Sequence, residues 1–179
     1  MPESLTATDL LFDAASFAAS AHRHQVRKDG QTPYAAHPFR VCLVVQLVFG
    51  IDDPKVLTTA LLHDTIEDTT TDYDDIAERF GADVARWVAA LTKDMRLEET
   101  AREADYHRVL AGAEWPVTIC KLADIYDNLS DSNTLSARGR ERGMSRARQY
   151  LDAMRPTLPP QATTAYAIVE QKLNAMQFA

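Results

Sequence analysis

The segment at residues 58–70, TTALLHDTIEDTT, carries four side chains that could do chemistry together. His63 and Asp64 follow an apolar run, and Glu67 and Asp68 come one helical turn later. Residues four apart share a face of a helix, so one helix through this segment predicts two columns, starting at His63 and Asp64. An imidazole with carboxylates suits a divalent metal ion, which lowers the pKa of bound water. The carboxylates one turn later can orient or deprotonate that water.

Two ligands from one helix leave a metal site incomplete, and two further residues have suitable contexts. His37 precedes a proline in YAAHPFRV, where a predicted helix begins. Asp124 interrupts the apolar face of ICKLADIYDN, and a buried carboxylate is unfavourable unless it is paired or binds a metal. Asn128 lies one turn beyond Asp124. An ordinary turn residue at His37 and a structural acid at Asp124 are the alternative interpretations.

The elements that must position these residues are helices. Helical periodicity runs through the chain, no useful strand alternation appears, and glycines and prolines mostly separate the periodic segments. We therefore expect one all-α domain, a bundle of about eight to ten helices. The expected helices cover residues 8–24, 38–49, 52–68, part of 69–81, 82–92, 97–111, 116–132, 144–154 and 163–176. The charged segment SARGRERG at residues 136–143 is expected to be a mobile loop.

The composition narrows the possible partners and location. The chain has 179 residues, 46% hydrophobic and 25% charged, which suits one soluble domain. A net charge of −7 argues against DNA, RNA or anionic membranes as partners, although a metal or local basic residues could still attract a small anion. The longest apolar run, residues 41–49, is too short to cross a bilayer, and no signal peptide is evident. Cys42 and Cys120 are expected as free thiols, so we predict a cytoplasmic protein.

The order of His37, His63-Asp64 and Asp124 resembles the H…HD…D pattern of the HD superfamily of metal-dependent phosphohydrolases. More narrowly, the chain resembles the hydrolase domain of RelA/SpoT enzymes and its stand-alone forms, the small alarmone hydrolases. The matching pieces cover most of residues 18–155 and are AHRHQVRKDGQTPYAAHPFRV, TTALLHDTIEDTTTDYDDIAERFGADVARWVAALTKD, KLADIYDNLSD and SRARQYLDAM. An HD pair alone is a weak motif, but LLHDTIEDT followed by FG, TK and KLAD is highly specific.

The resemblance implies one HD domain over residues 1–179, with core motifs at 18–155, a C-terminal helix on the core at 156–179, and no synthetase region. It also implies removal of the 3′-pyrophosphate of ppGpp or pppGpp, giving GDP or GTP and pyrophosphate. The implied metal is Mn²⁺, with Fe²⁺ or Mg²⁺ as alternatives, and Glu67 and Asp68 help to activate the attacking water. The implied metal ligands are His37, His63, Asp64 and Asp124.

The resemblance also implies a set of substrate contacts. Arg27 and Lys28, in RKDG, match a basic loop near the nucleotide and its phosphates. Asn128 matches a residue near the ribose and phosphate, and Tyr150 matches a tyrosine on the phosphate side of the pocket. The expected partner is therefore a small nucleotide, and a homo-oligomer is left open.

Three positions depart from the family pattern. Ile125 and Ser130 stand where the family has basic residues, and Asp127 stands where it has His or Tyr. The lost positive charge leaves two alternatives open. One is another phosphorylated nucleotide as substrate, such as NADPH, a pyrophosphorylated RNA end or a nucleoside 5′-phosphate. The other is a catalytically silent nucleotide-binding module. The basic residues that could compensate are Arg23, Lys93, Arg96 and Lys121.

Overall fold

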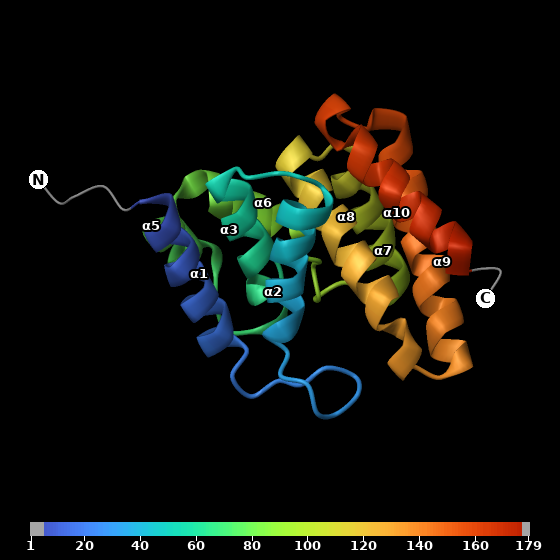
Figure 1. The fold of residues 1–179 in the computed structure, drawn as a ribbon, viewed down its shortest axis with the longest axis horizontal. Helices are drawn as coiled ribbons and strands as arrows, with labels where there is room; N and C mark the ends of the chain where they lie inside the picture. Colours follow the sequence, from blue (N-terminus) through green and yellow to red (C-terminus); the bar gives the residue numbers. More distant parts are fainter. Residues whose placement is uncertain (1–5, 177–179) are drawn as a thin grey trace, which may run out of the picture.

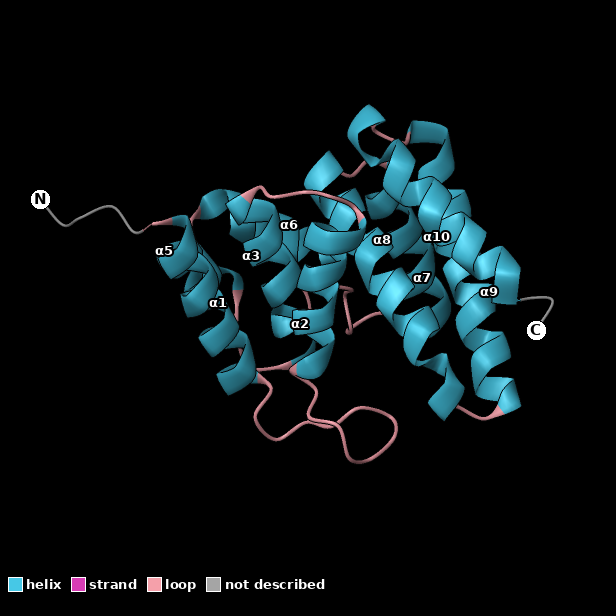
Figure 2. Ribbon diagram, viewed as in Figure 1, coloured by secondary structure: helices cyan, strands magenta, loops and turns pink. Residues whose placement is uncertain are grey.

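The computed structural model describes residues 6–176, apart from the side chains of residues 133 and 134. The predicted all-α architecture is confirmed, because this part of the chain forms ten α-helices and no β-strand (Figure 2). Residues 1–5 and 177–179 of the predicted domain lie outside the described residues. The helices are α1 (Ala7–Ala21), α2 (Ala36–Leu43), α3 (Pro54–Leu62), α4 (Thr65–Asp68), α5 (Tyr73–Phe80), α6 (Ala82–Leu91), α7 (Glu99–Ala111), α8 (Trp115–Ser130), α9 (Ala137–Met154) and α10 (Thr163–Met176).

The helices pack as two groups around a central pair. Helices α1, α3, α5 and α6 lie toward one end of the molecule, α7, α9 and α10 toward the other, and α2 and α8 between them (Figure 1). The first group encloses a small core that includes Ala14, Leu62 and Ile76. A larger core runs from α2 and α3 through α8 to α10. The predicted helix at the C-terminal end is present, since α10 packs against α8 and α9.

Helix α8 is buried on nearly every side, and this fixes the setting of the polar residues that it carries. It packs against α2, α3, α6, α9 and α10. Its apolar residues Val117, Ile119 and Leu122 are at most 1% exposed. Its charged residues Lys121, Asp124 and Asp127 are buried as well. A buried charge needs a partner, and the partners of Asp124 and Asp127 lie on neighbouring elements.

The expected single helix at residues 52–68 is wrong, because the chain turns at His63 and Asp64. Helix α3 ends at Leu62 and α4 begins at Thr65. Two side chains bond to carbonyls three residues earlier: His63 Nδ1 lies 2.8 Å from the Ala60 carbonyl, and the Thr65 hydroxyl donates to the Leu62 carbonyl over 2.7 Å. Such local side-chain bonds compete with regular helical bonding. The two columns predicted from a continuous helix are therefore replaced by a turn that carries His63 and Asp64.

The mobile loop expected at residues 136–143 is also wrong, since this segment begins α9 at Ala137. The Ser136 hydroxyl caps the helix by accepting the N–H of Gly139 over 3.2 Å. Arginine and glutamate are good helix formers, and they stabilise a turn that has no apolar periodicity. Helix α9 thus starts about two turns earlier than the periodicity predicts.

The structure also bears on the two cysteines and on membrane-spanning segments. Cys42 and Cys120 are free thiols, as predicted, although Cys42 is only half-buried. Among the described residues, no helix has both the length and the apolar character needed to span a bilayer.

Candidate metal centre and adjoining cavity

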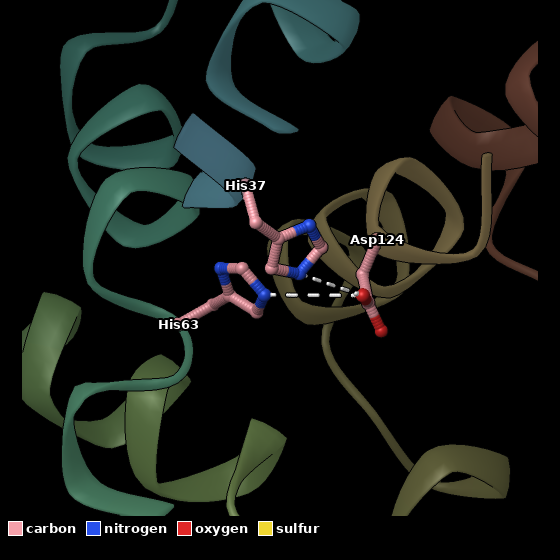
Figure 3. Close-up of side chains that lie close together, drawn as sticks. All are labelled: His37, His63 and Asp124. Carbon is pink, nitrogen blue, oxygen red and sulfur yellow. Dashed lines mark ion pairs between the residues drawn. The ribbon is translucent and has the colours of Figure 1, made fainter. Parts of the chain in front are cut away.

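Three predicted ligands from separate parts of the chain meet in the interior. His37 lies in the first turn of α2, His63 in the turn after α3, and Asp124 in the middle of α8. Each offers one ligand atom, and these atoms all lie within 4.8 Å of one another. Nε2 of His37 lies 3.2 Å from Oδ1 of Asp124, and Nε2 of His63 lies 3.9 Å from the same oxygen (Figure 3).

Asp64, the fourth predicted ligand, faces the same group. Its Oδ2 lies 3.4 Å from Nε2 of His37 and 3.2 Å from Nε2 of His63. Two imidazoles and two carboxylates therefore converge, a donor set found around divalent transition metals in proteins.

In both histidines the hydrogen bond is made by Nδ1, which leaves Nε2 available to bind a metal. Nδ1 of His63 lies 2.8 Å from the Ala60 carbonyl, which can only accept, so Nδ1 carries the proton. Nε2 of His63 is buried and makes no hydrogen bond within residues 6–176. Nδ1 of His37 lies 2.7 Å from Oδ2 of Asp127, so its Nε2 also faces the cluster. An outer partner on Nδ1 and an inward Nε2 lone pair are typical of metal-binding histidines.

The buried carboxylates of the cluster need a compensating positive charge. Burial alone would raise the pKa of Asp64, but when the imidazoles are protonated, the charge of His63 and the hydrogen bond from His37 hold this pKa well below its usual value. Burial also lowers the pKa of His37, yet its bonds to Asp124, Asp127 and Asp64 raise it well above the ordinary value. A proton on an imidazole or a bound cation can supply this charge, so metal binding releases protons.

The two predicted water-activating residues lie on α4, beside the cluster. Oε2 of Glu67 accepts the backbone N–H of Lys93 over 2.8 Å, which fixes the carboxylate in place. Burial raises the pKa of Glu67, and this is opposed by the same hydrogen bond and the charge of Lys93. Burial likewise raises the pKa of Asp68.

Tyr34 links Asp68 to the ligand group and is absent from the site residues predicted by sequence. Its hydroxyl lies 2.6 Å from Oδ2 of Asp64 and 3.0 Å from Oδ2 of Asp68. The single hydroxyl proton can be donated to either carboxylate. The available signal was its position three residues before His37, because residues at that spacing can face one site.

Asp127 has a different role from the one expected from the sequence. Loss of a basic side chain there was expected to weaken the phosphate path. Instead, the Asp127 carboxylate faces Nδ1 of His37 and accepts bonds of 2.6 and 3.0 Å from the Arg40 guanidinium. It does not line the adjoining cavity. Its spacing of three residues from Asp124 on one buried helix could have indicated this orientation.

A cavity of about 510 Å³ adjoins the cluster at Asp124, and its size suits a nucleotide. All four predicted substrate-binding residues line it: Arg27, Lys28, Asn128 and Tyr150. Ile125 lines it too, so one family departure does fall on the cavity wall, whereas Ser130 does not.

Asn128 and Lys121 connect the cavity to the cluster. Asn128 donates to Oδ1 of Asp124 over 2.5 Å, and its carbonyl oxygen accepts from Arg27 over 3.0 Å. Lys121 donates to Oδ2 of Asp124 over 2.8 Å and lies 4.5 Å from the ring centre of Tyr150. The carboxylate of Asp124 is therefore held by two side chains, each of which also contacts a residue predicted to bind substrate.

The basic residues suggested as compensation for the lost charge do not line the cavity. Lys93 pairs with Glu103 and Arg96 with Asp94. Arg23 bonds to the Ser20 carbonyl, near the C-terminal end of α1, and Lys121 is held by Asp124. The cavity's further positive charge comes from α9, which contributes Arg140, Arg142 and Arg146.

The chain matches the family model described as "HD domain" over residues 14–147. The mouse protein called guanosine-3′,5′-bis(diphosphate) 3′-pyrophosphohydrolase MESH1 is 41% identical over 130 residues, which cover 72% of this chain and 73% of that protein. An Aquifex aeolicus guanosine-3′,5′-bis(diphosphate) 3′-pyrophosphohydrolase is 42% identical over 119 residues, covering 65% of this chain and 17% of the longer enzyme.

A solved structure of a metazoan SpoT orthologue, described as hydrolysing ppGpp and acting in starvation responses, has the same fold. It superposes with a TM-score of 0.84 at 28% identity and covers 95% of this chain and 97% of its own. The chain belongs to the HD-domain family, and within it to the group that contains these pyrophosphohydrolases.

Proposed function

We propose that this chain is a metal-dependent pyrophosphohydrolase that removes the 3′-pyrophosphate of ppGpp or pppGpp and releases GDP or GTP. The observation that carries the proposal is the convergence of His37, His63, Asp64 and Asp124 beside a nucleotide-sized cavity. The named activity of relatives at about 40% identity supports the same reaction.

His37, His63, Asp64 and Asp124 would hold the metal. Two imidazoles and two carboxylates suit Mn²⁺ or Fe²⁺ better than Mg²⁺, which prefers oxygen ligands and keeps several waters. Once bound, the metal would supply Lewis acidity and lower the pKa of a coordinated water. Because both histidines are held through Nδ1, the chain presents their Nε2 atoms without rearrangement.

Glu67 and Asp68 would handle the proton of the attacking water. The water oxygen forms a bond to the phosphorus next to the ribose, and the bond from that phosphorus to the 3′-oxygen breaks. The proton leaves the water for a carboxylate, and the departing 3′-oxygen gains a proton. Burial raises the pKa of both acids, which makes them stronger bases than exposed carboxylates at neutral pH.

Arg27, Lys28, Asn128 and Tyr150 would hold the nucleotide. Arg27 is already ordered by Asp131 and Asn128, at 3.1 and 3.0 Å, so a phosphate would meet a preformed guanidinium. Asn128 also donates a hydrogen bond to Asp124, and this contact would hold the ribose at a fixed position relative to the metal.

The test is nucleotide chromatography after incubation of the purified protein with ppGpp and Mn²⁺, beside a sample with EDTA. We expect GDP and pyrophosphate with Mn²⁺ and intact ppGpp with EDTA. Intact ppGpp with Mn²⁺ would reject the proposal, and equal product in both samples would reject metal dependence.

The apolar Ile125 on the cavity wall favours a second candidate, the same chemistry on another phosphorylated nucleotide. A panel of ppGpp, NADPH, a pyrophosphorylated RNA end and a nucleoside 5′-phosphate, ranked by kcat/KM, separates the two. A preference for ppGpp of about 10²-fold, about 2.7 kcal/mol, would dismiss the alternative. Tight ppGpp binding without product under Mn²⁺ would indicate a silent nucleotide-binding module.

A further inference from the structure

The first turns of α9 bring arginines to the cavity that neither the sequence prediction nor the proposed mechanism uses. Arg140 and Arg142 both line the cavity, and Arg146 follows one turn later. Arg138, on the same turn, does not line it. The cavity wall therefore includes Arg140, Arg142 and Arg146 but stops short of Arg138, which lies one turn before Arg142.

The row formed by Arg142, Arg146 and Tyr150 leads away from the metal cluster. The three residues are four apart, so they share one face of α9. Tyr150 marks the metal end of the row, because Lys121 contacts both its ring and Asp124. At a rise of 1.5 Å per residue, the backbone of Arg142 lies about 12 Å along the helix from that of Tyr150.

The two ends of the cavity have opposite electrostatic character. At the metal end the cavity wall includes Asp124, and Asp64 lies beside it against the same two histidines. At the other end, neither the Arg140 nor the Arg142 guanidinium has an ion-pair or hydrogen-bond partner in the described part of the chain, and Arg146 only approaches Glu99 at 3.5 Å. Two cations without partners on a concave surface favour the binding of an anion. A guanidinium group can donate two parallel hydrogen bonds to the oxygens of a phosphate.

We infer that Arg140 and Arg142 form a second anion subsite, which binds the 5′-phosphates of a nucleotide whose 3′-phosphates lie at the metal. The inference rests on the proposed function for the orientation of the nucleotide. It predicts that a nucleotide with a 5′-di- or triphosphate binds more tightly than one with a 5′-hydroxyl.

Binding in the absence of metal tests the subsite separately from turnover. In EDTA the acidic metal end repels phosphates, so the phosphates of GTP should bind at the arginine end. We expect the double variant R140Q/R142Q to bind GTP about tenfold more weakly than wild type and guanosine equally well. The matched control is R138Q, an exposed arginine on the same helix, which should bind GTP like wild type. Equal melting temperatures of the variants would exclude an effect of folding.

The outcomes separate this inference from the proposed reaction. Unchanged GTP binding by R140Q/R142Q, an equal loss in R138Q, or no measurable GTP binding by wild type would each overturn the subsite. If wild type leaves ppGpp intact under Mn²⁺ while R140Q/R142Q selectively loses GTP, the subsite stands and the proposed reaction fails. If ppGpp is hydrolysed and GTP binding is unaffected by the substitutions, the reaction stands and the subsite fails.

Discussion

The candidate metal centre and the α9 wall of the cavity differ in burial and in how their side chains are held. Around the cluster the side chains are buried and most are held by hydrogen bonds, as in the pairing of His37 with Asp127 and of Asp124 with Asn128 and Lys121. The arginines of α9 that line the cavity are exposed, and the guanidinium groups of Arg140 and Arg142 have no partner among the described side chains. A preorganised cluster favours the chemical step, whereas exposed cations become ordered only when a ligand binds. Substitutions should therefore affect metal binding and kcat at the first region and KM at the second.

The largest effect is expected from loss of a ligand at the cluster. His63→Ala or Asp64→Ala should lower ppGpp turnover at saturating Mn²⁺ at least about 10³-fold, about 4 kcal/mol of transition-state stabilisation, because the metal is no longer held. His24→Ala, an exposed histidine outside the cluster, is the control and should retain activity. Circular dichroism checks that the helices remain, and substantial Mn²⁺-dependent activity in either ligand variant would contradict the assignment.

Removal of a proposed base should leave the metal in place. Glu67→Gln should lower kcat about 10²-fold while Mn²⁺ affinity changes little, because Glu67 contacts the Lys93 backbone and not the ligands. Burial raises the pKa of Glu67, so the active, ionised form is lost as pH falls through that raised value. Wild-type kcat at saturating Mn²⁺ should accordingly decline on the acid side, and this decline should be weaker in the residual activity of Glu67→Gln, in which Asp68 still titrates. An unaltered kcat would remove Glu67 from the mechanism.

A smaller effect is expected where a side chain acts through a ligand. Asp127→Asn removes the negative charge behind His37 and should weaken Mn²⁺ binding about tenfold, with kcat at saturating metal nearly unchanged. Calorimetric titration of Mn²⁺ measures this directly. Asp105→Asn is the control, because Asp105 lies on α7, a helix that carries none of the predicted ligands. A fall in kcat without a change in metal affinity would show that Asp127 does not act by positioning His37.

The smallest effect is expected on the cavity side, in the loop that carries Arg27 and Lys28. The Asp29 carboxylate accepts the N–H groups of Gln31 and Thr32 and the Thr32 hydroxyl, and these bonds lower its pKa to about 2. Asp29→Ala should loosen this turn and raise KM for ppGpp roughly threefold at constant kcat.

Asp29→Asn keeps an acceptor for the turn and should restore most of the affinity lost in Asp29→Ala. If kcat falls and KM does not change, the loop takes part in the chemical step, and the division between the two regions breaks down.

The sequence predicts which residues converge better than it predicts the geometry around them. His37, His63, Asp64 and Asp124 stand out because each is a polar residue in an apolar or helix-initiating context. The turn at His63 depends on hydrogen bonds from side chains to backbone carbonyls. Such bonds do not change the spacing of hydrophobic residues, so the periodicity does not reveal the turn. The start of α9 is missed for a related reason, because its first turns are polar and their stability comes from a cap and from propensity.

The supporting residues escape prediction because their partners are distant in sequence. Tyr34 and Asp64 are 30 residues apart, and His37 and Asp127 are 90 residues apart. Only the packing of α2 against α3 and α8 brings these pairs together. The extent of a single HD domain over residues 1–179 stays a prediction.

The most direct measurement is anomalous diffraction from crystals of the protein grown with Mn²⁺. We predict one strong peak per chain, within coordination distance of Nε2 of His37, Nε2 of His63 and the carboxylates of Asp64 and Asp124. The absence of a peak between these residues, or a peak only elsewhere in the molecule, would contradict the account.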